Sequence, residues 1–348
     1  MSFSQYTVRF FGFFLFLAFS LTACSAPYAE SESQFLLGTV CTIKLFNKKD
    51  SKLYPKAFEK IIQLEGILSA NEESSDIARI NSNQDLSPIR VRAELIEVLG
   101  KALEYAEKSG GAFDPSIGPL VKLWGIGTES EHLPGGEEIR QALELINYRD
   151  IQINYSEETV LLKKPLMSLD LGAIAKGYIA DEVALFLKEN GVQQAIIDLG
   201  GDIFALGEKE GKKGSSETYW RIGIQDPRKA RGSYIGILNV KNKSVVTSGD
   251  YERFFEEGGK RYHHIFSVES GFPAETGLKS VTIAADKAID ADALSTAAFV
   301  LGWEKGRRLV DSVPGAQGLF VFDDLTISLT GGLEKDFTLT APEYNQAK

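Results

Sequence analysis

The first half of the chain alternates segments of helical and strand periodicity. Apolar residues such as Phe58, Ile61 and Leu64 recur three or four positions apart where a helix is expected, and alternate with polar residues where a strand is expected. Helices are predicted at residues 54–68, 77–80, 93–108, 137–146 and 179–189. Strands are predicted at residues 34–46, 151–153, 160–163 and 195–199.

The second half is richer in strands. Strands are predicted at residues 219–225, 234–240, 244–248, 251–255, 262–266, 280–285, 318–322 and 326–329, and helices at 287–301 and 305–310. We find no internal repeat and no long linker in this part of the sequence. The pattern therefore predicts one α+β domain of mixed or antiparallel sheets packed with helices.

Two Gly-rich segments interrupt the periodic pattern. Residues 111–127 are dense in Gly, Pro and aromatic residues, which predicts an ordered loop that shapes a ligand site, although Phe113 and Trp124 are expected to pack in the core. In the second segment, a strand ending at Asp170 is predicted to turn through Gly172 into a helix. Lys176 is then placed to bind a phosphate; the alternative is that the glycines only permit tight packing.

Composition and charge narrow the functional classes. The chain has 348 residues, of which 43% are hydrophobic, enough to bury a substantial core. Its net charge of −10 gives no basic footprint for nucleic acid, so no nucleic-acid partner is expected. We find no Gly-x-Gly-x-x-Gly, P-loop, His-Glu-x-x-His or Gly-x-Ser-x-Gly motif, which argues against those nucleotide, zinc-protease and hydrolase sites.

The N-terminus is predicted to be a signal peptide at residues 1–23. One basic residue precedes an apolar run at 11–21 that is too short to span a membrane comfortably. The run ends in Leu-Thr-Ala-Cys, which resembles a bacterial lipoprotein box with Cys24 as the lipidated first residue of the mature chain. An ordinary secretory signal is the alternative. Residues 24–33 are expected to form a tether, and Cys41 a buried strand position rather than a nucleophile.

Asp292 and Thr296 form a candidate metal site. They stand four residues apart in a predicted helix, so their oxygens share one helical face and suit Mg²⁺ or Ca²⁺. A capped, solvated first helical turn is the alternative. His263 and His264 follow one another in a predicted strand, where neighbouring side chains face opposite ways, so at most one points into a site. His132 is expected at the surface.

Five blocks together resemble the ApbE family of FAD:protein FMN transferases. They are GAFDPSIGPLVKLWGIG (111–127), SLDLGAIAKGYIAD (168–181), DLGGDI (198–203), SGDYERFFEEGGKRYHHI (248–265) and ADALSTAAFVLG (291–302). The resemblance implies a T-fold-like catalytic domain, placed at residues 34–345. It also implies a Mg²⁺-dependent enzyme that joins FMN from FAD to a Thr or Ser hydroxyl through a phosphoester and releases AMP.

The resemblance also implies roles for individual residues. Metal ligands would be Asp292, Thr296 and the Ala173 carbonyl, with His264 and Asp292 as the catalytic pair and His264 moving a proton. The expected contacts to FAD are Leu37, Asn71, Ala112, Phe113, Asp114, Asp170, Lys176, Asp250 and Phe266, and Arg253 is expected to shape the same pocket.

One departure from the family pattern concerns Asn71, which stands where an aromatic residue usually stacks on the flavin. Looser binding of FAD would let water compete with the acceptor hydroxyl. A Mg²⁺-dependent FAD pyrophosphatase that yields FMN and AMP is therefore the first alternative. The second is a non-catalytic FAD-binding lipoprotein, against which the intact metal ligands argue.

The resemblance further implies an acceptor flavoprotein subunit of a membrane electron-transfer complex of the Rnf or Nqr kind, with a target motif Asp-x-x-Ser/Thr-Gly-Ala-Thr. The motif does not occur in this chain, which argues against a role as acceptor. Lipidation would place the enzyme on the extracytoplasmic, periplasmic face of the inner or outer membrane, and Ser25 does not distinguish the two.

Overall fold

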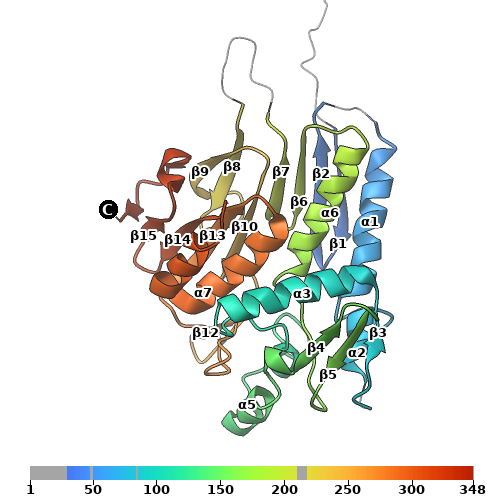
Figure 1. Cartoon of the computed structure of the whole chain (residues 1–348). Helices are drawn as coiled ribbons and strands as arrows, with labels where there is room; N and C mark the ends of the chain where they lie inside the picture. Colours follow the sequence, from blue (N-terminus) through green and yellow to red (C-terminus); the bar gives the residue numbers. More distant parts are fainter. Residues whose placement is uncertain (1–29, 48–49, 84, 210–217, 348) are drawn as a thin grey trace, which may run out of the picture.

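The computed structural model describes residues 30–47, 50–83, 85–209 and 218–347 (Figure 1). The predicted signal peptide, Cys24 and most of the tether lie outside these residues. The strand β1 begins at Glu30, so the ordered sheet starts before residue 34. No helix in the described ranges combines the length and the apolar content that crossing a membrane requires.

A nine-stranded sheet forms the centre of the molecule. In spatial order its strands are β1 (Glu30–Leu36), β2 (Thr39–Leu45), β6 (Ala195–Leu199), β7 (Asp202–Leu206), β10 (Lys243–Gly249), β13 (Leu278–Ala285), β14 (Gln317–Phe322), β15 (Thr326–Leu329) and β17 (Asn345–Gln346). All neighbours pair antiparallel except β15 and β17. The mixed sheet and its helices confirm the predicted α+β class.

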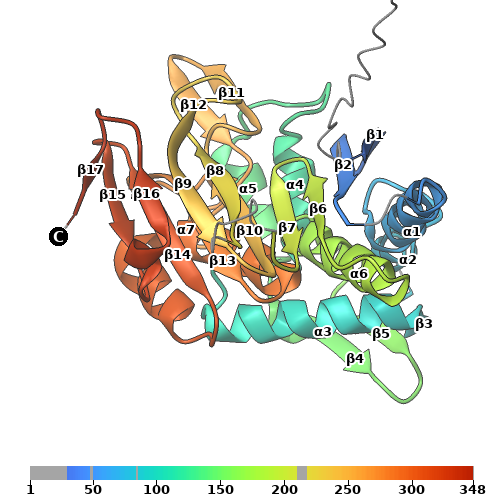
Figure 2. The same ribbon diagram turned by 90° about the horizontal axis from the view of Figure 1, so that it is seen from above.

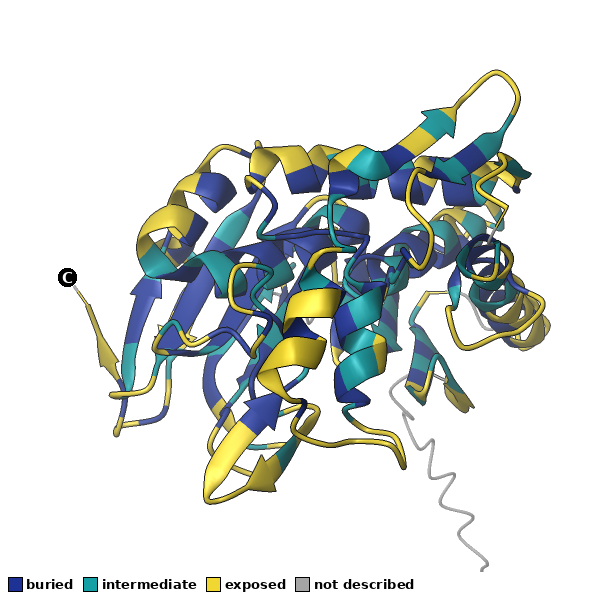
Figure 3. Cartoon of the chain, turned by 90° about the horizontal axis from the view of Figure 1, so that it is seen from below, coloured by how far each residue is buried: buried dark blue, intermediate teal, exposed yellow. Residues whose placement is uncertain are grey.

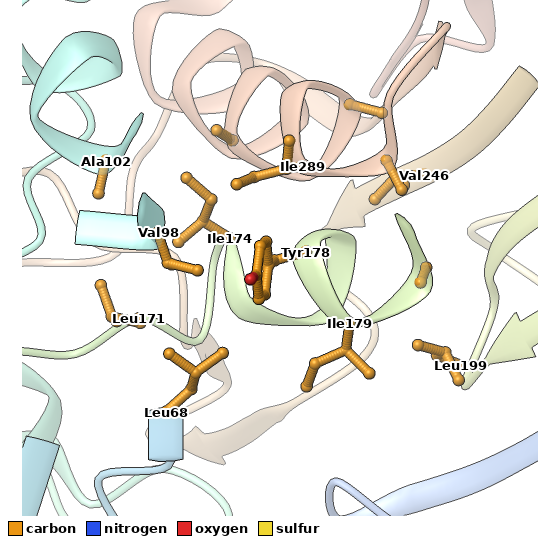
Figure 4. Close-up of a cluster of buried hydrophobic side chains, with 14 of the residues drawn as sticks. Leu68, Val98, Ala102, Leu171, Ile174, Tyr178, Ile179, Leu199, Val246 and Ile289 are labelled. Carbon is orange, nitrogen blue, oxygen red and sulfur yellow. The ribbon is translucent and has the colours of Figure 1, made fainter. Parts of the chain in front are cut away.

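The helices α1 (Leu53–Leu68), α6 (Ala175–Glu189) and α7 (Ala288–Asp311) cover one face of this sheet. The helix α3 (Ala93–Lys108) packs on α1 and α7, α2 (Asp76–Asn81) packs on α1, and α4 (Gly118–Trp124) and α5 (Gly136–Leu143) pack on each other. Residues Tyr148–Asp150 and Leu333–Lys335 form 3-10 turns. The helices α6 and α7 lie directly on the strands, and α3 crosses beneath them as an outer layer (Figure 2). Their apolar faces meet in the main core, shown by Leu68, Val98, Ile174, Tyr178 and Ile289 (Figure 4).

Three smaller sheets complete the fold. They are β16 (Phe337–Leu339), β9 (Tyr234–Val240) and β8 (Trp220–Gln225); β3 (Ile89–Arg90), β5 (Thr159–Leu162) and β4 (Ile151–Asn154); and β11 (Phe254–Glu257) with β12 (Lys260–His263). The first packs on the sheet face opposite the helices, where Ile222 and Leu238 join Val245 and Leu319 in a second core. Buried positions concentrate between these layers, while outer helix faces and loop tips are exposed (Figure 3).

Several predicted boundaries were wrong for local reasons. Residues 34–46 form a hairpin rather than one strand, because Leu37 and Gly38 turn with φ of 56° and 67°. Residues 118–124 form the helix α4, which has a proline in its first turn and a left-handed Gly125 at its end. Residues 167–170 form one isolated bridge, Ser168 to Ile117, instead of a strand. The predicted strand at 251–255 begins at Phe254, and that at 262–266 ends at His263.

The separation of the last two predicted helices is confirmed. Gly302 has φ 71° and ψ −178°, so the α7 path breaks there into two helical stretches. A non-glycine residue rarely adopts this conformation, and the sequence signal was the glycine that ends the run of Ala and Leu. The first stretch presents Asp292 to the interior of the molecule.

Candidate functional site

One cleft of about 1040 Å³ brings together segments from across the chain. It is lined by the turn after β1, the loop after α1, residues 112–114, the start of α6, the β6–β7 turn, part of β8, and residues from β10, His264 and α7. This volume is at the upper end of small-molecule sites. The cleft is therefore large enough for a dinucleotide.

Nearly all the predicted site residues line this cleft. They are Leu37, Asn71, Ala112, Phe113, Asp114, Asp170, Ala173, Lys176, Arg253, His264, Phe266, Asp292 and Thr296. The exception is Asp250, which lines a neighbouring cavity of about 340 Å³ together with His263 and Lys279. There its Oδ2 accepts a hydrogen bond from Lys279 Nζ at 2.7 Å, and its buried Oδ1 has no hydrogen-bond partner among the described residues.

The centre of the cleft holds a buried charge cluster. Lys176 at the first turn of α6 pairs with Asp202 at the start of β7, and its Nζ lies 3.7 Å from Asp292 Oδ1. Burial disfavours the ammonium form, but the two carboxylates raise the pKa of Lys176 above its usual range. The lysine is therefore a fixed positive charge, which can bind a phosphate when the ligand competes with Asp202.

Asp292 is held where α6 and α7 touch. Its Oδ2 accepts the backbone N–H of Gly177 at 2.9 Å, one of the N-terminal amides that a helix leaves unpaired. Burial raises the pKa of Asp292 to about 6, although the nearby Lys176 opposes this shift. A cation at Oδ1 would compensate the remaining cost of the buried negative charge.

The surrounding oxygens suit a hard cation. Thr296 lies one helical turn beyond Asp292, and its Oγ1 is 3.0 Å from Ser248 Oγ on β10. Ala173, just before α6, also lines the cleft. Carboxylate, hydroxyl and carbonyl oxygens are ligands that Mg²⁺ accepts while keeping several waters. No three His, Cys, Asp or Glu side chains cluster as a metal site among the described residues, so binding here would depend on those neutral oxygens.

The two Gly-rich segments lie side by side and form one wall. Ile117 bridges Ser168, and the Asp170 N–H donates to the Pro115 carbonyl at 2.9 Å. Gly118 is required at the crossing, because a Cβ there would lie 2.5 Å from Ser168 Oγ. Residues before Gly118 thus pair with the second segment, whereas residues 118–124 of the predicted loop form the helix α4.

Asp114 holds this wall from within. One of its oxygens accepts from the Ser116 N–H and hydroxyl at 2.8 and 2.6 Å, and the other accepts from the Tyr148 N–H at 3.0 Å. Burial raises the pKa of Asp114. Its oxygens therefore fix the loop, and the adjacent Phe113 belongs to the main core and also lines the cleft.

The two histidines separate as predicted. His263 is buried against Phe299, with ring centroids 5.6 Å apart, whereas the half-buried His264 lines the cleft. His264 Nδ1 lies 3.1 Å from the Arg253 carbonyl oxygen, which can only accept, so Nδ1 carries the proton and Nε2 the lone pair. Burial and the Arg253 guanidinium lower the pKa of His264 to about 3, so the ring is neutral at pH 7.

An aromatic cluster supports this side of the cleft. Trp124 at the end of α4 lies 5.6 Å from both Tyr262 and Phe266, measured between ring centroids, and its Nε1 donates to the Gly271 carbonyl at 2.9 Å. The predicted core role of Trp124 is confirmed, since its side chain is fully buried. Packing on both sides of His264 thus fixes the segment that carries it.

Asn71 and Leu37 lie at the rim. Asn71 is exposed in the loop after α1, and the Leu37 N–H donates to Glu65 Oε1 at 3.0 Å. The stretch 68–72 offers the cleft only Leu, Ser, Ala, Asn and Glu side chains. This edge therefore lacks a stacking ring.

His132 is exposed and Cys41 is buried, as predicted, and burial raises the pKa of the Cys41 thiol to about 11.

Three contributors were missed by the reasoning from sequence. Asp202 and Ser248 lie within the blocks 198–203 and 248–265, but no role was predicted for either side chain. Asn81 pins the second Gly-rich segment, because its amide bonds the Leu169 N–H and carbonyl at 2.7 and 2.9 Å. These contacts join residues distant in sequence, so no local pattern could identify them.

Comparisons with known proteins agree with this geometry. The sequence model of the ApbE family matches residues 37–320. The chain is 40% identical to the FAD:protein FMN transferase of Treponema pallidum over 87% of each chain, and 36% identical to that of Klebsiella pneumoniae over 86% of this chain and 91% of the relative. Those relatives are flavin-transferring enzymes by name.

Solved structures show the same fold. An ApbE protein from Thermotoga maritima superposes with a TM-score of 0.80 at 32% identity, covering 88% of this chain and 99% of the other. The flavin transferase ApbE from Vibrio cholerae gives 0.78 at 25% identity with the same coverage. The fold and the site thus define an enzyme of the flavin-transferase class. The chain belongs to the ApbE family.

Proposed function

We propose that the protein is a Mg²⁺-dependent FAD:protein FMN transferase. The observation that carries the proposal is a single cleft lined by a fixed cation, a buried carboxylate with neighbouring neutral oxygens, and a neutral imidazole. Cleavage of a phosphoanhydride mainly requires charge neutralisation and alignment, which these groups supply.

In the proposed reaction, the acceptor hydroxyl oxygen bonds to the FMN phosphorus. The bond between this phosphorus and the bridging oxygen breaks, and AMP leaves with that oxygen. The hydroxyl proton passes to His264 Nε2 and then to solvent or the leaving group. Lys176 would hold the diphosphate and stabilise its growing negative charge.

Asp292, Thr296 and the Ala173 carbonyl would hold the magnesium ion. When bound, the ion supplies Lewis-acid stabilisation of the diphosphate oxygens. Gly177 keeps the Asp292 carboxylate oriented through its N–H, and Ser248 does the same for the Thr296 hydroxyl. These second contacts leave the two ligands little rotational freedom.

A second candidate function is FAD pyrophosphatase activity. The exposed Asn71 at a rim without aromatic residues supports it, because nothing there stacks on the flavin and excludes water. Water would then replace the acceptor hydroxyl as nucleophile, giving free FMN and AMP.

One product analysis distinguishes these functions. The protein is incubated with FAD and Mg²⁺, with and without a peptide carrying Asp-x-x-Thr-Gly-Ala-Thr. AMP only with peptide, together with flavin that survives denaturation on the peptide, supports transfer. FMN plus AMP without peptide supports hydrolysis, which Asn71→Tyr should reduce. Intact FAD in both tubes overturns both functions and leaves a FAD-binding lipoprotein.

The role of His264 has its own test. We expect His264→Ala to lower kcat by about 10² to 10⁴ with little change in the Kd for FAD, because a proton acceptor is lost and the pocket is kept. His132→Ala, at an exposed position, is the matched control. Unchanged turnover in the His264 variant would show that the ring moves no proton.

We further propose that Cys24 is lipidated and anchors the enzyme on the extracytoplasmic face of a membrane, near an acceptor subunit of an electron-transfer complex. The short apolar run at 11–21 followed by Cys24 supports this. Metabolic labelling with a fatty-acid probe, compared with Cys24→Ala, tests it. Equal labelling of the two proteins would contradict the anchor.

A further inference from the structure

The expected FAD contacts and metal ligands account for only part of the cleft. They lie on the α1–α2 loop, residues 112–114, the start of α6, Phe266 and α7. The same cleft continues along the β6–β7 turn, Arg231 and five consecutive residues of β8, from Arg221 to Gln225. None of these residues is among the expected contacts to the dinucleotide.

The second arm has an open strand edge as one wall. Among the described strands, β8 pairs only with β9 and forms the edge of its small sheet. Figure 2 shows the β8–β9 hairpin lying across the large sheet, beside β7 and β10. An unpaired edge presents a row of backbone N–H and C=O groups that can bind another extended chain.

Missing side chains leave room for such a chain. Gly201 on the β6–β7 turn and Gly232 before β9 both line the arm, and a Cβ built on either would meet no atom within 4 Å. On β8 itself, the ring of Tyr234 lies over Gly223, with its Cδ1 2.6 Å from where a Cβ would be, so the open approach is at Gly201 and Gly232. Backbone can therefore approach closely from the cleft side.

One arginine of the arm is available to bind an acidic group. The arm also carries Asp198, Asp202 and Glu252, of which Asp202 pairs with Lys176 and Glu252 with Arg231. Arg231 is already paired, with its Nη2 2.8 Å from Glu252 and 3.3 Å from the Gly200 carbonyl. Arg221 projects from the exposed face of β8 and makes no ion pair within the described part of the chain. An unpaired arginine beside a strand edge complements a carboxylate on the bound segment.

We propose that the second arm is the acceptor site, in which a segment of the acceptor protein lies extended along the free edge of β8. Its target hydroxyl enters the first arm, and an acidic side chain near it pairs with Arg221. The proposal rests on the proposed transferase function and names how that function selects a protein. Continuity of the two arms in one cavity lets a single segment reach both β8 and the diphosphate site.

The test uses the full chain, FAD, Mg²⁺ and the peptide Asp-x-x-Thr-Gly-Ala-Thr extended by three residues on each side. A series of peptides carries one backbone N-methyl group each, moved along the sequence. A strand donates to its neighbour from alternate residues. We therefore expect kcat/KM for the peptide to fall about tenfold or more at every second position and to stay near that of the unmodified peptide between them.

The possible outcomes distinguish a failure of strand pairing from a failure of the proposed transferase function. If kcat/KM falls for none of the methylated peptides, or falls equally for all of them, strand pairing is overturned while transfer remains established. No transfer to the unmodified peptide overturns the transferase function and the inference with it. If β8 instead pairs with a second copy of the enzyme, kcat/KM should not depend on the position of the N-methyl group. That result would also count against the proposal.

A charge reversal gives an independent measurement. Arg221→Glu should raise the KM for the Asp peptide about tenfold, and replacing that Asp by Lys should restore most of the loss. Arg308→Glu, on an exposed turn at the end of α7, is the matched control with no expected change. Failure of the Lys peptide to rescue the Arg221 variant would refute the charge pairing.

Discussion

Gly177 is the position where one methyl group should damage both stability and activity. It lies in the first turn of α6, against the first turn of α7. A Cβ built on it would be 2.3 Å from the Ala288 carbonyl oxygen and 2.8 Å from Asp292 Cβ. Ordinary contact begins near 3.4 Å, so in Gly177→Ala the two helices must separate by about 1.1 Å, the difference between 3.4 and 2.3.

The expected cost follows from this displacement. Overpacking a well-packed site costs about 1–3 kcal/mol, and the better helix propensity of Ala returns about 0.5–1 kcal/mol. The free energy of unfolding should therefore fall by about 1 kcal/mol, and by no more than about 2.5 kcal/mol. Activity should fall further, about 10²-fold, because a shift of about 1 Å carries Asp292 away from the reacting phosphates.

Urea unfolding and turnover of FAD at a series of Mg²⁺ concentrations measure the two effects. The control is Gly66→Ala in α1, where a Cβ meets no atom within 4 Å. It should be neutral or stabilising by up to about 1 kcal/mol, with unchanged turnover. If Gly177→Ala also kept its stability and its turnover, the close approach of α6 and α7 would not be what positions Asp292.

Three further predictions concern the supports of the site. Asp181 accepts the Ala288 and Ile289 N–H groups at 2.8 and 3.0 Å, and burial raises its pKa to about 6. Protonated Asp181 stabilises the folded protein. This stabilisation is complete below the pKa that the carboxyl has in the unfolded chain, and it is lost as pH rises through about 6. Between pH 4 and 7, the free energy of unfolding of Asp181→Asn should therefore fall by up to about 3 kcal/mol less than that of the unmodified protein. Identical pH profiles of the two proteins in urea unfolding would contradict this. Trp124→Ala should cost about 3–5 kcal/mol in chemical denaturation and loosen the segment carrying His264; a loss below 1 kcal/mol would show that the ring cluster is not structural. Lys176→Met should weaken FAD binding about tenfold or more in calorimetry, because Asp202 and Asp292 then meet the diphosphate uncompensated; an unchanged Kd would exclude the lysine as a phosphate ligand.

Local periodicity determined most of the elements. The helices at 53–68 and 93–108 and the break at Gly302 followed from apolar spacing and glycine placement, because these signals act within a few residues. The predictions failed where a turn lacked its usual residue type or a helix was too short to show a period. Leu37 turns the chain with a positive φ although it is not glycine, and α4 is too short for its periodicity to stand out.

The residue types of the site were also readable in sequence. Asp292 and Thr296 at helical spacing, Lys176 after a Gly-rich turn, and one of two adjacent histidines were each identified by their chemistry. The structure brings them into one cleft, which spacing alone could not establish.

Only the tertiary structure decided how these residues are held and what lies beside them. Asp250 faces the neighbouring cavity, Asp202 pairs with Lys176, and Asn81 reaches across 88 residues to fix Leu169. The free edge of β8 likewise becomes a wall of the cleft only when its sheet packs on the central one. Sequence patterns report each residue's local environment, whereas these relations arise from contacts between distant segments that form together when the core packs.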